Sequence, residues 1–438
     1  MDNKKDFKPF ISADKIVPEF TFTSLFIGIL LAVVFGAANA YLGLRVGMTV
    51  SASIPAAVLS MGIIRVILRR DSILENNMVQ TIGSAGESVA AGAIFTLPAL
   101  FLWAADGVEG IEAPGLFEIF LIALVGGTLG VLFMIPLRKA LIVEEHGVLP
   151  YPEGTACAEV LLAGEEGGSK ASVVFSGLGI AAVYKFVADG LGVFPSSVNY
   201  DIKAYKGSAV GMDVLPALVG VGYICGPRIA SYMFSGSVLS WFVLMPLISL
   251  FAGDAIIFPG TKPISSLAPS ELWGTYIKYI GAGAVAAGGI MSLIKSLPMI
   301  VTTFKDAMKG YGKGKGDSNL RTDQDLPTAG VLIAALVVAV VIWLLPPVPV
   351  NLLGAFIIVI FGFFFATVSS RMVGLIGSSN TRYPVWRSRR FCFPRLLCVR
   401  PGGTGHSSYT AVIAIGAIIC IIAAIAGDTS QDLKPVTS

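Results

Sequence analysis

A polar segment between two apolar runs restricts this chain more than any other feature. The runs cover residues 24–44 and 49–68, and each is close to the roughly 20 residues that cross a bilayer core. The segment from Asn39 to Ala57 overlaps both runs and carries Asn, Tyr, Arg, Ser and Thr side chains together with Gly and Pro. In hydrocarbon such groups persist only against protein or a water-lined cavity, because an unsatisfied polar group is costly there. The pattern indicates a polar pathway through a membrane.

The composition favours an all-α, polytopic transmembrane helix bundle. Of the 438 residues, 55% are hydrophobic and 13% are charged, whereas soluble domains carry about 25% charged residues. The five cysteines have no paired spacing, so neither a disulfide framework nor a metal cluster is expected. The first twenty residues lack the apolar core of a signal peptide.

Hydropathy predicts about 11 spans. They lie near residues 24–45, 48–69, 78–104, 116–137, 171–192, 209–226, 228–252, 275–300, 328–346, 351–371 and 409–427. Lys and Arg residues gather in the N-terminal tail, after the second and fourth spans and after the eighth, which predicts a cytoplasmic N-terminus. Residues 141–168 fit either a re-entrant segment lying against the cavity or an amphipathic turn at the surface.

Glu87 is the strongest candidate for a functional residue. It lies about nine residues into the third span, and an intramembrane carboxylate suggests an ion or substrate role. Such a group can bind and release a proton, or it can stay protonated and hydrogen-bonded to a neighbouring helix. Gln80, Thr81, Ser84 and Ser88 share this span.

The opening segment supplies further candidates. Asn39 and Tyr41 could line a vestibule, while Arg45 could extend to the headgroups. Pro55 could break the second helix and free backbone carbonyls for a ligand, or only bend it.

Enzyme signatures are nearly absent, so we expect no catalytic residues, no cofactor and no resident metal. There is no HExxH motif and no Walker motif. The run Phe251–Asp254 faintly resembles the motif of an intramembrane aspartyl protease but lacks its first glycine. That activity is a further alternative.

Four segments closely resemble the bacterial branch of the oligopeptide transporter family, which is related to the yellow stripe-like metal-chelate carriers. They are AYLGLRVGMTVSASIPAAVLSMG (40–62), ENNMVQTIGSAGESVAAGAIFTLPAL (75–100), YPEGTACAEVL (151–161) and AGDTSQDLK (426–434). The resemblance implies a secondary active, cation-coupled transporter, with protons as the expected ion, for oligopeptides or peptide-like metal chelates. It also implies a chain that is C-terminally truncated, because members of the family are longer.

Residues 381–407 depart from the family pattern. The stretch from Asn380 carries six arginines, no lysine and no acid where the family has a span. Met78–Ser84 and Met372–Ser378 share Met-Val-x-x-Ile-Gly-Ser, a possible internal repeat, and each copy should lead into an outward span. We therefore hypothesise a shifted reading frame; the alternative is a genuine Arg-rich cytoplasmic loop. With no span at 381–407 the terminal Gly427–Lys434 segment emerges outside, and with one it lies inside.

These observations give the following expectations. Residues 1–20 form a cytoplasmic tail, 21–380 the transporter bundle, 381–407 the anomalous segment, and 408–438 a terminal span and tail. Glu87 exchanges the coupling proton, and the substrate is held by polar residues of the first three spans and the 149–160 segment: Asn39, Tyr41, Ser51, Ser53, Gln80, Ser84 and Glu153. The partners are short peptides or metal chelates, protons and the bilayer of the bacterial inner membrane, with no nucleic acid. The alternative is a membrane fragment of such a carrier that transports nothing.

Overall fold

The computed structural model describes most of the chain and divides it into two compact units. The described residues are 17–46, 49–70, 72–105, 112–145, 149–166, 168–195, 197–213, 216–281, 326–345, 350–377 and 407–434, with single residues between these ranges. One unit comprises Met1–Ala171 and Leu293–Ser438, and the other comprises Ser172–Ser292.

The first unit is a bundle of helices. Its elements are α1 (Phe22–Val46), α2 (Ser53–Met61) with the π-helical turn η1 (Gly62–Ile67), α3 (Ile73–Ala93), α4 (Pro98–Ala105), α5 (Leu116–Arg138) with η2 (Lys139–Glu144), α6 (Pro152–Glu166), α12 (Thr328–Leu344), α13 (Leu352–Ile376) and α15 (Ser407–Asp432). In the described part of the whole chain, six helices are long and apolar enough to cross a membrane. Five belong to this unit, namely Phe22–Leu44, Ile73–Ala105, Leu116–Arg138, Leu352–Ile376 and Thr410–Asp432, and Gly226–Ala252 belongs to the second unit. The predicted polytopic helical membrane fold is therefore confirmed.

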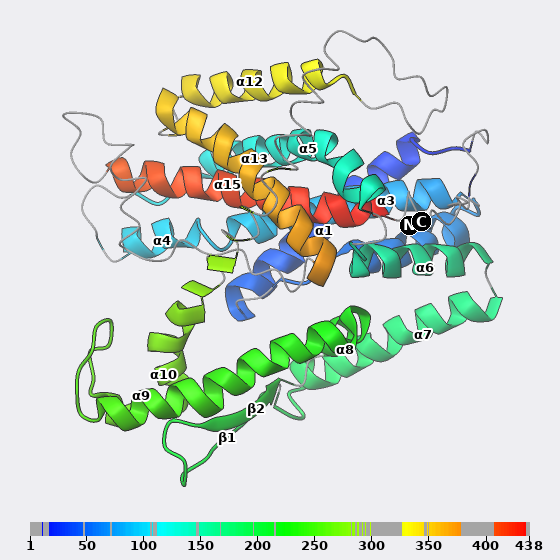
Figure 1. Cartoon of the computed structure of the whole chain (residues 1–438). Coiled ribbons are helices and arrows are strands. Elements are labelled where there is room, and N and C mark those ends of the chain that lie inside the picture. The colour runs from blue at the N-terminus through cyan, green and yellow to red at the C-terminus, as the bar shows by residue number, and fades with distance from the viewer. Residues whose placement is uncertain are drawn as a thin grey trace. The chain divides into compact units, whose positions relative to one another are not determined.

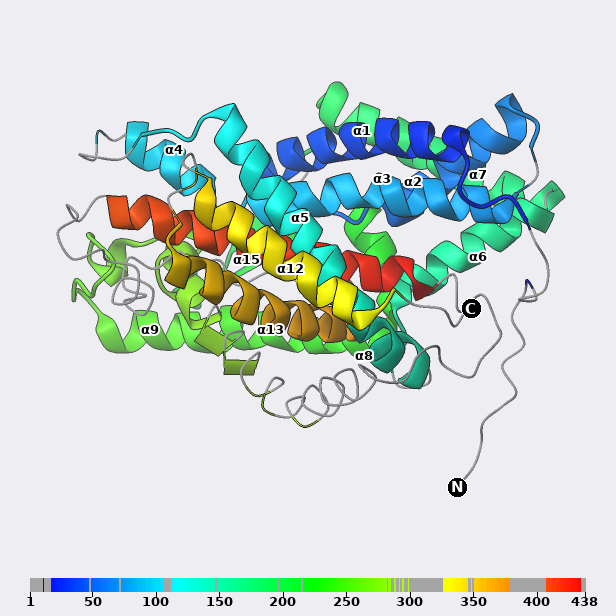
Figure 2. The ribbon, with the colours of Figure 1, turned by 90° about the horizontal axis from the view of Figure 1, so that it is seen from above.

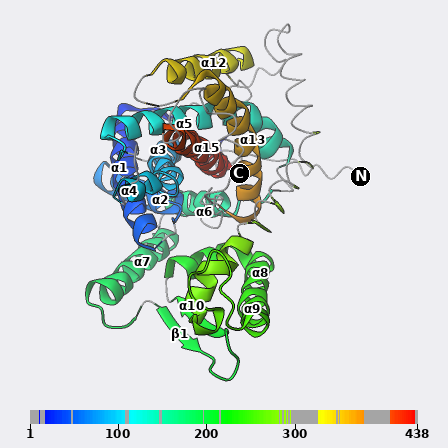
Figure 3. The ribbon, with the colours of Figure 1, turned by 90° about the vertical axis from the view of Figure 1, so that its left-hand side faces the viewer.

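Helix α15 is the centre of this unit. In the most apolar stretch of α15, 72% of the residues are buried, compared with 22% in the most apolar stretch of α1. Figure 3 shows α15 nearly end-on, with α3, α5, α6 and α13 around it. The main hydrophobic core joins Ile418, Ile422 and Ile425 of α15 to Leu129 of α5 and Ile358 of α13. A helix buried on all sides can carry polar groups that lipid would exclude.

The helices pack closely because glycines lie directly against the backbone of the neighbouring helix. A Cβ on Gly86 of α3 would lie 2.1 Å from the backbone oxygen of Ala32, and one on Gly92 would lie 2.5 Å from the Cα of Ile421. Helices in membranes associate through such small residues, since hydrophobic exclusion from water does not act between them. Figure 2 shows α1 and α3 side by side along their length.

Contacts along the helices give their directions. Gly354, Gly362 and Ser370 of α13 meet Ile415, Ile422 and Ala426 of α15 in that order, so α13 and α15 are parallel. By the same reasoning α3 is antiparallel to α15, because Gly92 lies at Ile421 while Ser88 lies at Asp428.

The second unit contains helices and one β-hairpin. Residues 168–171 of its first helix belong to the other unit. The elements are α7 (Gly168–Lys185), η3 (Phe186–Gly190), β1 (Ser197–Asp201), β2 (Ala209–Asp213), α8 (Pro216–Val238), η4 (Leu239–Leu244), α9 (Met245–Ala252), η5 (Ile264–Ser266), α10 (Pro269–Leu272) and η6 (Trp273–Ile277). The antiparallel hairpin pairs Ser197 with Asp213 and Asp201 with Ala209 (Figure 1).

Two boundaries differ from the sequence-based expectations. The span expected at 209–226 begins instead with strand β2, because alternating residues such as Val210 and Met212 pair with β1. The last helix does not end at residue 427 but continues to Asp432, and Asp428 and Asp432 are buried. Most of the expected polar tail is thus part of the bundle core. The anomalous segment 381–407 lies outside the described residues except for Ser407, so its interpretation stays a prediction.

Candidate functional site

The last turn of α15 meets α2 and α3 in a buried polar cluster. The Asp432 carboxylate accepts hydrogen bonds from Ser53 Oγ at 2.7 Å, from Gln80 Nε2 at 2.5 Å and from Ser84 Oγ. Asp432 is 3% exposed, and Gln80 and Ser84 are completely buried. Three segments distant in sequence therefore converge on one carboxylate.

Glu87 lies one turn further along α3 and belongs to the same region. Its Oε2 accepts a hydrogen bond of 3.2 Å from the backbone N–H of Ala52, and the residue is buried. Asp428, Glu153 and Asp432 are all close enough to interact electrostatically with it. Ser88 Oγ donates to the Asp428 carboxylate. We call Glu87, Asp428, Asp432 and their partners Ser53, Gln80, Ser84 and Ser88 the acidic cluster.

Asn39 fixes the extended segment that leads into α2. Its side-chain amide donates to Val50 O at 3.0 Å and accepts from Val50 N at 3.2 Å, so it pairs both backbone groups of that residue. Helix α2 begins at Ser53, with Pro55 in its first turn. A proline is tolerated there because the first helical N–H groups have no partner within the helix. The N–H of Ala52, the residue before the helix, donates to Glu87.

Helix α6 closes the cluster from another side. Gly154 N donates to Gln431 Oε1 at 2.8 Å, and Gln431 Nε2 donates to Val373 O at 3.0 Å, so one side chain joins α6 to α13. A Cβ on Gly154 would lie 2.2 Å from the backbone oxygen of Gln431. Of the two interpretations of residues 141–168, this packing favours a segment that lies against the core.

Near this contact Lys434 Nζ lies over the Tyr151 ring, 5.8 Å from its centroid. Burial lowers the pKa of the Lys434 ammonium and raises the pKa of the Tyr151 phenol. Both shifts have the same cause, since each charged form loses hydration.

Most of the residues proposed from the sequence lie in or beside the cluster. Ser53, Gln80, Ser84 and Glu87 belong to it, and Ser51 Oγ reaches Ser53 Oγ at 3.3 Å. Glu153 is buried at the start of α6. Asn39 is buried against Val50, whereas Tyr41 is 61% exposed on α1. Tyr41 therefore does not share the buried surroundings of the other candidates.

Sequence reasoning missed the two aspartates of α15. Hydropathy ends the last span at residue 427 and predicts a polar tail after it, although the AGDTSQDLK segment (426–434) is one of the four that carry the family resemblance. Their spacing carried a usable signal, because residues 428 and 432 are four apart and share one face of a helix.

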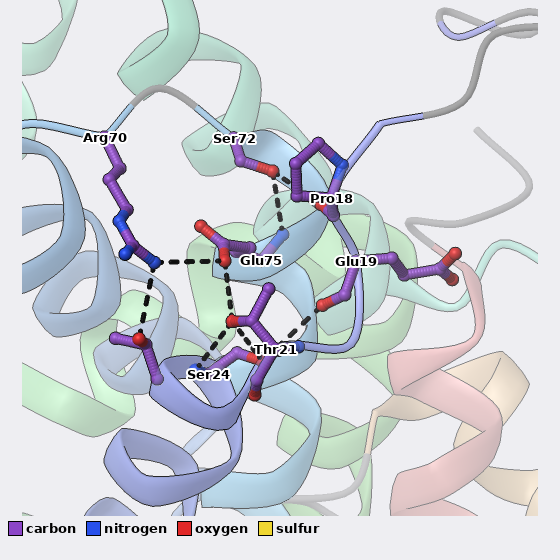
Figure 4. Close-up of polar contacts among 8 residues, drawn as sticks. Pro18, Glu19, Thr21, Ser24, Arg70, Ser72 and Glu75 are labelled. Carbon is purple, nitrogen blue, oxygen red and sulfur yellow. Dashed lines mark hydrogen bonds and ion pairs between the residues drawn. The ribbon is translucent and has the colours of Figure 1, made fainter.

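A second polar cluster fixes the starts of α1 and α3 (Figure 4). Thr21 Oγ1 donates to Glu75 Oε1 at 2.6 Å, and Arg70 lies 3.8 Å from the same oxygen. Ser72 caps α3 by accepting from Glu75 N and donates to Pro18 O at 2.7 Å. Each of these bonds joins the two helix starts or caps one of them, which indicates a structural role.

In the described part of the chain, no group of three or more His, Cys, Asp or Glu side chains is arranged to hold a metal ion. The acidic cluster consists of buried carboxylates, hydroxyls and an amide. Burying several negative charges together is unfavourable unless protons or cations offset them. The arrangement is therefore suited to binding and releasing positive charge.

Comparison with known proteins adds a family match. The family model described as OPT oligopeptide transporter protein matches residues 19–435. A Haemophilus influenzae protein named provisionally as an oligopeptide transporter is 32% identical over 425 residues, covering 90% of this chain and 64% of its own length. The metal-nicotianamine transporter YSL3 of Arabidopsis thaliana is 29% identical over 336 residues, covering 69% of this chain and 47% of its own. The chain thus spans less than two thirds of these relatives.

Proposed function

Because the chain belongs to the OPT oligopeptide transporter protein family, we propose that it is a proton-coupled secondary transporter of short peptides or peptide-like metal chelates. The names of the relatives support this range of substrates, since they include an oligopeptide transporter and a metal-nicotianamine transporter. The protein would lie in the inner membrane of a bacterium, with its N-terminus in the cytoplasm.

The observation that carries the proposal is the acidic cluster at the helix junction of α2, α3 and α15. Within the described residues, Glu87 receives one hydrogen bond, from the backbone N–H of Ala52, and has Asp428, Glu153 and Asp432 nearby. Its ionised form is thus weakly stabilised, which favours proton exchange. Ser51, Ser53, Gln80 and Ser84 supply the hydroxyl and amide groups that could hold peptide backbone or chelate carboxylates.

Uptake into proteoliposomes tests this function. Vesicles holding the purified chain would receive an inward proton gradient together with a labelled tripeptide or a labelled iron–nicotianamine chelate. Uptake that follows the gradient supports the proposal and identifies the substrate class. Glu87→Gln should leave gradient-independent uptake and abolish its dependence on the gradient; coupled uptake that survives this change would show that Glu87 is not the proton site.

The second candidate is a membrane fragment of such a carrier that transports nothing. Uptake by the Haemophilus influenzae relative, beside none by this chain under the same conditions, would favour this alternative.

A further inference from the structure

The amide of Gln80 has an unused acceptor inside the acidic cluster. Its Nε2 donates to Asp432 Oδ1 at 2.5 Å, while its Oε1 has no hydrogen-bond partner in the described part of the chain. Both atoms are bonded to one carbon, so the oxygen lies in the same cluster as the carboxylate. Gln80 is completely buried, and a buried acceptor without a partner costs about 1–3 kcal/mol. An occupant of positive charge would remove that cost.

The buried carboxylate of Asp432 would also be stabilised by a positive charge. Its hydrogen bonds within the described residues come from Ser53, Gln80 and Ser84, which are all neutral. A buried carboxylate without a counter-charge is unfavourable by several kcal/mol. Neutral donors lessen this cost but do not balance the charge.

Asp432 and Glu87 also differ in their donors. Among the residues that the structure describes, Asp432 accepts three hydrogen bonds on its two oxygens, whereas Glu87 accepts one, from Ala52. Hydrogen bonds to a carboxylate favour its ionised form, so a negative charge is better stabilised on Asp432. A proton on Asp432 would compete with donors already in place. A metal cation would not, because a serine hydroxyl can donate to the carboxylate while its oxygen lone pairs face the ion.

We propose that Asp432, Gln80 Oε1 and the hydroxyl oxygens of Ser53 and Ser84 bind one alkali-metal cation of the size of sodium. One carboxylate with neutral oxygens balances a single positive charge. Divalent and transition metals favour sites richer in carboxylate, imidazole or thiolate, and the described residues form no such group. As a second coupling ion this cation rests on the proposed transport function, whereas its binding can be measured without transport.

Thermal unfolding of the purified full chain in detergent tests the binding. Sodium chloride would replace choline chloride at constant ionic strength and pH, with tryptophan fluorescence as the readout. Sodium should raise the midpoint by a few degrees, because a ligand that binds only the folded state stabilises it. Asp432→Asn should lose the sodium-dependent shift, while Asp254→Asn, at an exposed aspartate bonded to Ser265, should retain it.

Gln80→Met keeps the carboxylate and removes only the amide, so it stands in if Asp432→Asn does not fold. It should raise the half-saturating sodium concentration at least tenfold. Equal midpoints in sodium and choline, or a sodium shift that persists in both variants, would overturn the proposal. Glu87→Gln should retain the sodium-dependent shift of the unfolding midpoint. Loss of proton-coupled uptake in that variant would therefore be distinguished from loss of sodium binding at Asp432.

Discussion

Ser53, the first residue of α2, donates a hydrogen bond of 2.7 Å to Asp432, 379 positions later in the last turn of α15. The contact joins the polar segment between the first two spans to the end of α15, the most buried of the six membrane-length helices in the described part of the chain. Ser84 of α3 donates to the other oxygen of the same carboxylate. The two serines thus share one acceptor group, the Asp432 carboxylate, through its two oxygens.

This shared acceptor makes the effects of serine substitutions depend on each other. Ser53→Ala and Ser84→Ala should each destabilise the protein by about 1.5–3 kcal/mol, the range for hydrogen bonds to charged groups. The double variant should be non-additive, because residues in one network couple. Ser176→Ala, which removes an exposed hydroxyl bonded within its own helix, should have little effect. Denaturation midpoints measure all four variants, and strict additivity would contradict the network.

A glycine in α3 has no room for a side chain. In Gly86→Ala the new Cβ would meet the backbone oxygen of Ala32 at 2.1 Å, so α1 and α3 must separate and the midpoint should fall by several degrees. Gly177→Ala is the matched control, because Gly177 is helical and its Cβ would meet nothing within 4 Å. This control should be neutral or stabilising by up to about 1 kcal/mol. Similar losses in both variants would show that close packing at Gly86 is not the cause.

Gln431 should restrain α6. Gln431→Ala removes the hydrogen bonds to Gly154 N and Val373 O, so α6 should separate from the helix bundle more often. Cys157 on α6 is completely buried and reports this separation. In a variant with Cys157 as the only cysteine, maleimide labelling should become several-fold faster after the substitution. Ser231→Ala, at an exposed serine of α8, provides the control, and unchanged labelling by Gln431→Ala would contradict the restraint.

Asn39 should protect the backbone amide of Val50. In Asn39→Ala both bonds to Val50 are lost, so hydrogen exchange in a peptide covering residues 49–53 should accelerate. Tyr41→Phe, which changes an exposed ring two positions away, should leave exchange unchanged. Equal protection in Asn39→Ala and the parent would show that the side chain does not fix this segment.

The parallel directions of α13 and α15 bear on the Arg-rich stretch between them. Two parallel helices that cross one bilayer require the chain to cross back between them, and the hypothesis of a shifted reading frame for residues 381–407 would supply a span in that place. Resequencing the gene should reveal a compensating pair of insertions or deletions flanking these codons. An unbroken frame that matches relatives across 381–407 would end the hypothesis.

The sequence by itself determined the membrane class, most of the spans and the presence of a carboxylate, Glu87, inside one of them. Hydropathy and polarity within a span are local properties of the chain, so they can be read without knowing the neighbours of a helix. The sequence did not determine which polar residues meet. Asn39 and Tyr41 end the same apolar run, yet two positions turn a helix by about 200°, and only Asn39 is buried.

The tertiary structure decided that Asp428 and Asp432 lie in the core. Their surroundings depend on small residues of α3 and α5 that let α15 approach closely, such as Gly92 and Gly126. In a bilayer, partner helices are selected by such packing and by hydrogen bonds between distant segments. No local pattern encodes that choice, which is why the polar end of α15 resembled a tail in the sequence and forms part of the candidate site in the folded chain.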